Sequence, residues 1–106
     1  MVLARMTIWK FKPDEREQGI NTLYEALSGP AHGQKGFVGD LTFLSQDDDG
    51  AVTTISLWEN EETRTDSEIL LKKAFEISQK SLTGSPEIKN FRVYSAELNV
   101  GLHSHI

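Results

Sequence analysis

The chain has 106 residues, 38% of them apolar and 25% charged, with a formal net charge of −5 and no cysteine. This length fits one domain, and the composition is that of a folded protein and excludes a disordered one. The acidic balance argues against a nucleic-acid partner, and the lack of cysteine excludes disulfides, thiolate metal sites and a cysteine nucleophile.

Residues 2–11, VLARMTIWKF, predict a first β-strand that is apolar on both faces. β-branched and aromatic residues alternate along it and are interrupted by Arg5 and Lys10. The segment is far shorter than the roughly 20 residues of a membrane span, and it lacks the layout of a signal peptide. We therefore expect a cytoplasmic protein with no membrane partner.

A helix is predicted to follow Pro13. Asp14 and Glu17 have the spacing of an N-terminal capping box. Four residues recur at the spacing of one buried helical face, namely Ile20, Leu23, Tyr24 and Leu27. Gly19 lies inside the helix and weakens it, and the sequence Ser-Gly-Pro at 28–30 is expected to end it.

Residues 37–45 and 51–58 predict two further strands joined by a hairpin. The connection contains three aspartates, residues 47–49, followed by Gly50. A calcium loop with glycine at its sixth position needs a glutamate at its twelfth, where this chain has Ser56. Aspartate and glycine are also the residues that solvated turns prefer, so the sequence predicts a turn and no metal site.

The second helix is predicted to begin at Asn60, an N-cap residue followed by two glutamates. Its inner face is expected to use Ile69 or Leu70, then Ala74, Phe75, Ile77 and Ser78, with Leu82 near its end. Residues 83–86 break this helix, and residues 90–98 predict the fourth strand. A single domain over 1–100 and a loose tail over 101–106 complete the prediction.

The order of elements is β-α-β-β-α-β, which predicts an α+β, ferredoxin-like fold with a four-stranded antiparallel sheet. Two helices cover one face, yet the strands are apolar on both. Leu3, Trp9 and Phe11 oppose Val2, Met6 and Ile8, and Ile55 and Leu57 oppose Val52 and Trp58. A second copy of the chain is the commonest cover for such a face, so we expect a homodimer formed through the sheet.

Few residues have the chemistry of a catalytic site. The chain has neither a G-x-S-x-G elbow nor a phosphate-binding glycine loop. His32, in a glycine-rich loop, is either a base at a pocket mouth or a solvated side chain. His103 and His105 form a weak H-x-H signal in the tail. Trp9 and Trp58 either fill the core or line a cavity for a planar ligand.

Three stretches resemble the antibiotic biosynthesis monooxygenase family of dimeric α+β barrels: GFVG at 36–39, the acidic hairpin tip, and SLWENEE at 56–62. The resemblance extends over nearly the whole chain in element order. It implies a barrel of two subunits with an apolar cavity between sheet and helices in each. It also implies oxidation of quinols or polycyclic phenols by molecular oxygen, with no metal, flavin or other cofactor.

In polyketide-oxidising members of that family, an Asn and a Tyr flank a strand-three Trp. Trp58 matches the Trp, and the flanking positions are Thr54 and Arg64. Thr54 keeps a hydrogen-bond donor, and Arg64 stabilises a phenolate if it points inward and not to the outer helix face. The residues with which haem-degrading members bind haem are absent, because Met6-Thr7 and Ser67 stand in those regions.

Two hypotheses follow. The first is a cofactor-independent monooxygenase for a small quinol or phenol, with His32 and Arg64 as catalytic residues and Trp58, Thr54 and Trp9 in contact with the substrate. The second is a non-catalytic homodimeric module, which either binds a small aromatic ligand or is purely structural.

Overall fold

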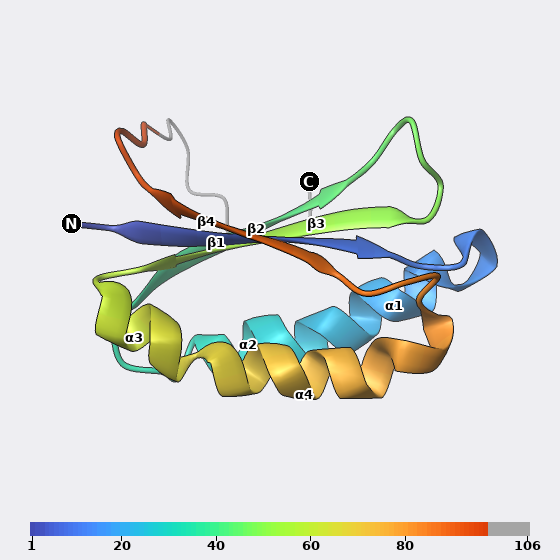
Figure 1. Ribbon diagram of the computed structural model, residues 1–106, viewed down its shortest axis with the longest axis horizontal. Coiled ribbons are helices and arrows are strands. Elements are labelled where there is room, and N and C mark those ends of the chain that lie inside the picture. The colour runs from blue at the N-terminus through green and yellow to red at the C-terminus, as the bar shows by residue number, and fades with distance from the viewer. Residues whose placement is uncertain (98–106) are drawn as a thin grey trace.

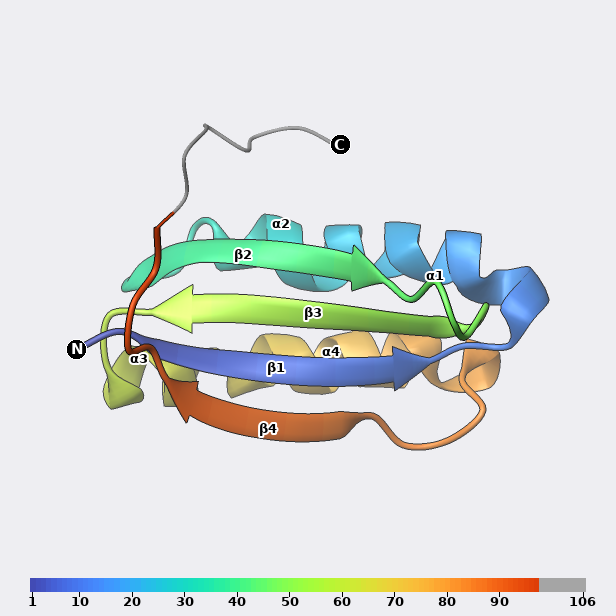
Figure 2. The same cartoon turned by 90° about the horizontal axis from the view of Figure 1, so that it is seen from above.

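The computed structural model describes residues 1–97 and arranges them in two layers, a sheet and a set of helices that lie on one of its faces (Figure 1). The strands are β1 (Leu3–Lys10), β2 (Phe37–Leu44), β3 (Ala51–Trp58) and β4 (Glu87–Arg92). They form one antiparallel sheet in the order β2-β3-β1-β4 (Figure 2). The predicted α+β, ferredoxin-like arrangement is confirmed.

The first helical segment is longer than predicted. It comprises η1 (Pro13–Glu15), α1 (Arg16–Leu23), the π-helical turn η2 (Tyr24–Ser28) and α2 (Gly29–Ala31). In η2 the Gly29 N–H donates to the carbonyl of Tyr24, five residues back. This wider turn relieves the clash between a proline ring and the preceding carbonyls, so Pro30 lies inside the helix without ending it. The predicted end at 28–30 is wrong.

The start of this segment also differs from the prediction. Asp14 makes no capping hydrogen bond, because the chain enters through the 3-10 turn η1 with Pro13 at its first position. Proline suits that position because its fixed φ is already helical. The predicted capping box of Asp14 and Glu17 is therefore wrong.

The ring of Phe11 packs closely against α1 at Gly19. A Cβ atom on Gly19 would lie 2.5 Å from the Phe11 ring, so the glycine allows this close packing and is not merely a weak point. Ile20, Leu23 and Leu27 pack into the core as predicted. Tyr24 is 58% exposed, contrary to prediction, because it lies about 100° around the helix from Leu23.

The second helical segment comprises α3 (Glu61–Asp66), α4 (Glu68–Ser78) and the 3-10 turn η3 (Gln79–Ser81), with a break at Ser67. The predicted cap is confirmed, since the Asn60 side chain accepts a hydrogen bond of 2.9 Å from the Thr63 N–H. Thr63 completes the capping box from its own side chain.

The buried face of α4 is formed by Leu71, Ala74 and Ser78, at the i, i+3, i+7 spacing. Ile77 is exposed, so its predicted burial is wrong. Of the alternatives Ile69 and Leu70, Ile69 is exposed and Leu70 is half-buried. Residues two positions apart on a helix point to nearly opposite sides, and Ile69 is two positions before Leu71. Leu82 lies in the core as predicted, together with Trp9, Phe11, Leu23, Val52, Leu71 and Ala74.

The connection between β2 and β3 is a turn, as predicted. Ser45 Oγ accepts a hydrogen bond from the Asp48 N–H at 3.0 Å, and Asp48 Oδ1 accepts one from the Gly50 N–H at 2.9 Å. Side chains that bond to nearby backbone are what stabilise such turns. Among residues 1–97, no three acidic or histidine side chains lie close enough together to hold a metal ion.

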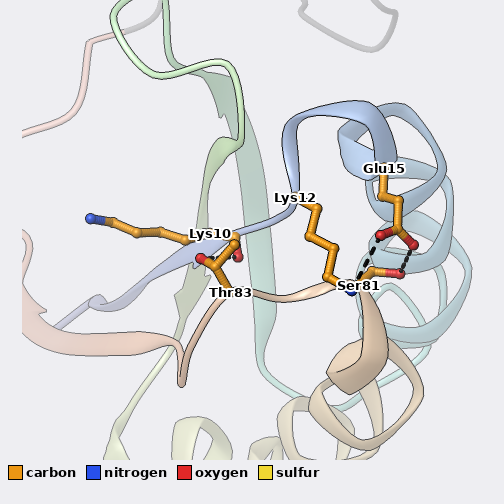
Figure 3. Close-up of polar contacts among 5 residues, drawn as sticks. All are labelled: Lys10, Lys12, Glu15, Ser81 and Thr83. Carbon is orange, nitrogen blue, oxygen red and sulfur yellow. Dashed lines mark hydrogen bonds and ion pairs between the residues drawn. The ribbon is translucent and has the colours of Figure 1, made fainter.

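The end of the helical layer is closed by a set of polar contacts that we call the loop latch, formed by Lys10, Lys12, Glu15, Ser81 and Thr83 (Figure 3). Thr83 donates from its N–H and its hydroxyl to the Lys10 carbonyl, at 2.8 and 3.1 Å. Ser81 Oγ donates to Glu15 Oε1 at 3.0 Å, and the Lys12 ammonium lies 3.7 Å from Glu15 Oε2. The loop after η3 is thereby fixed to the end of β1.

Strand β4 begins at Glu87, three residues earlier than predicted, and ends at Arg92. Its position is set by pairing with β1, in which Glu87 lies opposite Ile8 and Arg92 opposite Leu3. The predicted range of 90–98 is therefore wrong. The predicted domain end at residue 100 and the tail over 101–106 lie outside the described residues. No described helix has the length and apolar character needed to cross a membrane.

The strand register separates two faces of the sheet. Arg5, Thr7 and Trp9 of β1 lie opposite Ser56, Thr54 and Val52 of β3, on the face that the helices cover. Ala4, Met6 and Ile8 lie opposite Leu57, Ile55 and Thr53, on the face that no described helix covers. Phe43 and Phe91 are exposed. The predicted pair of apolar faces is thus present.

Candidate functional site

A groove of about 460 Å³ lies between helix α4 and the sheet, at the side where β4 forms the edge. Its lining comes from three elements and the loop before β4. Arg5 and Trp9 come from β1, Leu71 and Phe75 from α4, and Ile88 and Asn90 from β4. This volume is within the range of small-molecule sites, and the elements that form it are rigid secondary structure.

The back of the groove is polar at one end, where Arg5 lies, and apolar at the other, where Trp9 lies. Arg5 and Trp9 project from the same face of β1, four residues apart, which is roughly 13 Å along a strand. Trp9 exposes no surface to water and Arg5 only 4%. Both therefore form the closed back of the groove, and its solvent-exposed walls are α4 and β4.

Arg5 is held in place by the break between the two helices. Its Nη1 donates to Ser67 Oγ at 2.9 Å, and its Nη2 donates to the Arg64 carbonyl at 2.6 Å. The last carbonyls of a helix need partners from outside it. The Arg64 carbonyl, at the end of α3, accepts from the Ser67 N–H and hydroxyl as well as from the guanidinium. Ser67, at the junction, is itself buried.

The charge of Arg5 has no acidic partner at contact distance. The two ion pairs found in residues 1–97 are Lys12–Glu15 and Lys89–Glu87. Burial lowers the pKa of Arg5 from its ordinary value, the negative charge of Glu68 opposes that change, and the positive charge of Arg64 adds to it. An arginine nevertheless stays protonated in proteins, so the groove contains a buried positive charge.

The two tryptophans are both buried, with their indole N–H groups bonded to the sheet. Trp9 Nε1 donates to Thr54 Oγ1 at 3.0 Å, and Trp58 Nε1 donates to Ser56 Oγ at 2.9 Å. Trp9 lines the groove, whereas Trp58 is outside its lining. Thr54 reaches the groove only through its hydrogen bond to Trp9.

His32 lies at the opposite edge of the sheet from the groove, beside β2. Its Nδ1 is 2.7 Å from the Ser28 carbonyl, and its ring centroid is 4.6 Å from that of Phe37. Phe37 in turn meets Trp58 edge to face, with 5.5 Å between ring centroids. Trp58 belongs to β3, so strand β1 lies between this aromatic row and β4. The structure therefore does not bring His32 and Trp9 together.

Arg64 is half-buried on α3, and it contributes to the groove region through its backbone carbonyl, which accepts from Arg5. The five predicted site residues thus fall in two places, Trp9 with Thr54 and Arg64 near the groove, and Trp58 with His32 near β2. The catalytic and substrate-binding roles given to them stay predictions.

Sequence reasoning missed Arg5, because a single arginine in an apolar strand was read only as an interruption. A signal was available. Arg5 has the same parity as Trp9 and Phe11 along the strand, which places it on the face that those aromatics share. A charged residue on the buried side of a strand needs a partner or a function.

Solved structures share this fold over nearly the whole chain. A protein of unknown function from Nitrosomonas europaea has a TM-score of 0.78 at 16% identity, covering 94% of this chain and 96% of that one. A conserved protein from Methanosarcina mazei Go1 has a TM-score of 0.76 at 15% identity, covering 87% and 92%. An antibiotic biosynthesis monooxygenase has a TM-score of 0.73 at 10% identity, covering 88% and 99%.

These similarities confirm the fold expected from the sequence resemblance. At such low identity the likeness extends to the fold and not to an activity. No protein-family model matches the sequence, and neither does any curated protein.

Proposed function

We propose that the chain binds a small quinol or phenol in the groove between α4 and β4 and oxidises it with molecular oxygen, as a cofactor-independent monooxygenase. The observation that carries this proposal is the groove itself, a cavity of about 460 Å³ with the indole of Trp9 and the ring of Phe75 in its lining. A similar structure that bears the name antibiotic biosynthesis monooxygenase supports the type of reaction.

The chemistry makes modest demands on a protein. A quinol passes two electrons and two protons to O2, which gives a quinone and hydrogen peroxide. That reaction inserts no oxygen atom into the product. Monooxygenation applies to a polycyclic phenol whose keto tautomer has a ring CH2 group: one oxygen atom of O2 becomes the new carbonyl, and the other leaves as water with the two hydrogens. The substrate supplies every electron, so the protein has only to bind, deprotonate and shield it.

Within the groove, the residues divide these tasks. Phe75 and Leu71 pack against the ring, and Thr54 acts as a positioning residue through the indole of Trp9. Glu68 is the carboxylate in the lining, and it accepts the phenolic proton in this proposal. Trp58 and His32 stay candidates for a separate role beside β2.

Oxygen uptake tests this proposal. The wild-type chain is incubated with a panel of quinols and naphthols, and uptake is measured against the non-enzymatic rate. Ile88→Trp fills the groove from β4, and Ile69→Trp makes the same exchange on the outer face of α4. We expect the first variant to lose at least about tenfold in rate and the second to keep the wild-type rate. Uptake that Ile88→Trp leaves unchanged contradicts the proposed site.

A non-catalytic binding module is the second candidate. It is favoured by the placement of His32, the one histidine in residues 1–97, outside the groove. The groove then contains a carboxylate and no imidazole to act as a base. Saturable binding of a naphthol without any oxygen uptake above background supports this candidate over the first.

We also propose that the chain is a homodimer in which the uncovered faces of two sheets pack together. That face contains Met6, Ile8, Ile55 and Leu57 in adjacent register positions. A contiguous apolar surface of this kind is unusual on a monomer, and a second copy is its commonest cover. In a purely structural protein this dimer is the whole function.

A further inference from the structure

Arg5 has hydrogen-bonding capacity that the described residues do not use. A guanidinium has five N–H donors, and the two bonds found for Arg5 go to a neutral hydroxyl and a neutral carbonyl. Buried charges in proteins are ordinarily paired with an opposite charge. In residues 1–97 no carboxylate lies within ion-pair distance of this guanidinium.

The role of Arg5 as a cap for α3 does not account for its charge. A neutral amide donor of suitable length also satisfies a carbonyl and a hydroxyl, without the free-energy cost of burying a cation. The capping bonds do fix the orientation of the guanidinium, which leaves it in the back wall of the groove. A preorganised cation binds an anion at less entropic cost than a mobile one.

The other polar groups of the groove add no net charge. Glu68 and Lys72 lie on α4, both are exposed, and their opposite charges offset each other. Asn90 lies directly opposite Arg5 in the β1–β4 register, and its amide provides a further donor at the same end. The net charge of the lining is therefore the positive charge of Arg5.

From these positions we infer that the end of the groove at Arg5 and Asn90 is a subsite for an anionic oxygen, and that the ligand is an aromatic acid. Its ring lies along Leu71 and Phe75 toward Trp9, and its phenolate or carboxylate oxygen accepts hydrogen bonds from Arg5. This inference rests on the proposed function for the location of the ligand. It assigns to Arg5 the anion-binding role predicted from sequence for Arg64.

A matched pair of probes tests the inference by isothermal titration calorimetry. 2-Naphthoate and 2-naphthamide have the same ring system and nearly the same shape, and only the first is charged. We expect wild-type protein to bind 2-naphthoate at least about tenfold more tightly, because hydrogen bonds to charged groups are roughly twice as strong as neutral ones. Arg5→Gln should remove this preference and leave the binding of 2-naphthamide, and Arg5→Lys should keep part of it.

A second pair of variants avoids any change in the buried layer. Glu68→Gln removes the acidic group that competes for Arg5, and Glu76→Gln makes the same exchange at an exposed position of α4 outside the groove lining. We expect Glu68→Gln to tighten 2-naphthoate binding several-fold, with 2-naphthamide unchanged, and Glu76→Gln to change neither. This comparison decides the question even if Arg5→Gln does not fold.

The outcomes separate the inference from the proposal on which it rests. Equal affinity for the two probes, or tighter binding of the amide, overturns the anion subsite and leaves the aromatic groove in place. Failure of both probes to bind the wild-type chain overturns the groove as a ligand site, and the inference with it. A preference for 2-naphthoate that persists in Arg5→Gln assigns the anion to another group and contradicts the role of Arg5.

Discussion

The two faces of the sheet are both apolar but differ in the polar groups that they contain. The face that the helices cover contains the buried Arg5 and Thr7 and the half-buried Thr54, together with both tryptophans. The face without helices contains mainly aliphatic side chains, including Met6, Ile8 and Ile55. Polar groups are ordinarily placed toward water and apolar ones toward a covering layer.

The composition of each face fits a different proposed binding partner. The polar groups of the covered face are bonded to one another, as Trp9 is to Thr54 and Arg5 to Ser67, which fixes their positions around the groove. On the uncovered face the Lys89–Glu87 ion pair lies at the β4 edge, beside Met6 and Ile8. The apolar surface between β1 and β2 suits a second sheet. The proposed ligand would account for the polar groups of the first face, and the proposed second copy of the chain would cover the second.

The largest effect is expected from Trp9→Ala, because Trp9 is a fully buried side chain in the core between the covered face and the helices. Loss of this volume leaves a cavity, and we expect the free energy of unfolding to fall by about 3–5 kcal/mol. Urea denaturation followed by circular dichroism measures the change. Lys10→Ala, next in the strand and exposed, is the control and should change it by less than about 0.5 kcal/mol.

The uncovered face is tested by Ile55→Lys. Ile55 lies between Met6 of β1 and Leu41 of β2, so a lysine there places a charge in the centre of the proposed dimer interface. We expect the dissociation constant to rise at least a hundredfold, which is about 2.8 kcal/mol, as measured by sedimentation equilibrium.

Ile69→Lys is the matched control for this variant, since Ile69 is an exposed isoleucine on the opposite, helical side of the molecule. It should leave the oligomeric state unchanged. A wild-type chain that sediments as a monomer at micromolar concentration contradicts the dimer, and the aliphatic face then needs a different explanation.

A smaller effect distinguishes the two faces within a single strand. Thr54→Val removes the hydroxyl that accepts the Trp9 N–H and leaves a buried donor without a partner. We expect a loss of about 1–2 kcal/mol in the free energy of unfolding. Thr53→Val changes the next residue, which faces the uncovered side, and should be neutral or slightly stabilising. Equal effects of the two variants would mean that the covered polar groups do not act as a bonded layer.

The sequence was sufficient to predict the elements whose signals are local. Residues 37–45 and 51–58 were predicted as strands, and the structure has Phe37–Leu44 and Ala51–Trp58. β-branched residues and an aspartate-glycine turn specify such a hairpin within about twenty residues. Asn60 was recognised as a cap for the same reason, because its partner Thr63 is three residues away.

Features that depend on distant partners were not predictable in this way. The range of β4 follows from its register with β1, to which the sequence of β4 alone gives no guide. Arg5 bonds to groups that are 62 and 59 residues away in the chain, and only the fold shows that these converge. The passage of a helix through Pro30 depends on a π-turn, a rare backbone form that has no sequence signature here.

The smallest change in the free energy of unfolding is expected from removing the charge of Lys12, which lies outside both faces of the sheet. Lys12 and Glu15 form an ion pair of 3.7 Å in the loop latch, with side chains 52% and 33% exposed. Lys12→Gln should lower the free energy of unfolding by less than about 0.5 kcal/mol, because water and salt screen exposed pairs. Denaturation at low and high salt measures this, and a loss above 1 kcal/mol at high salt would contradict it. Arg5 carries the same charge as Lys12 but is only 4% exposed. In the proposed anion subsite, this burial would let Arg5 select a ligand, whereas the exposed Lys12 only helps to hold a loop.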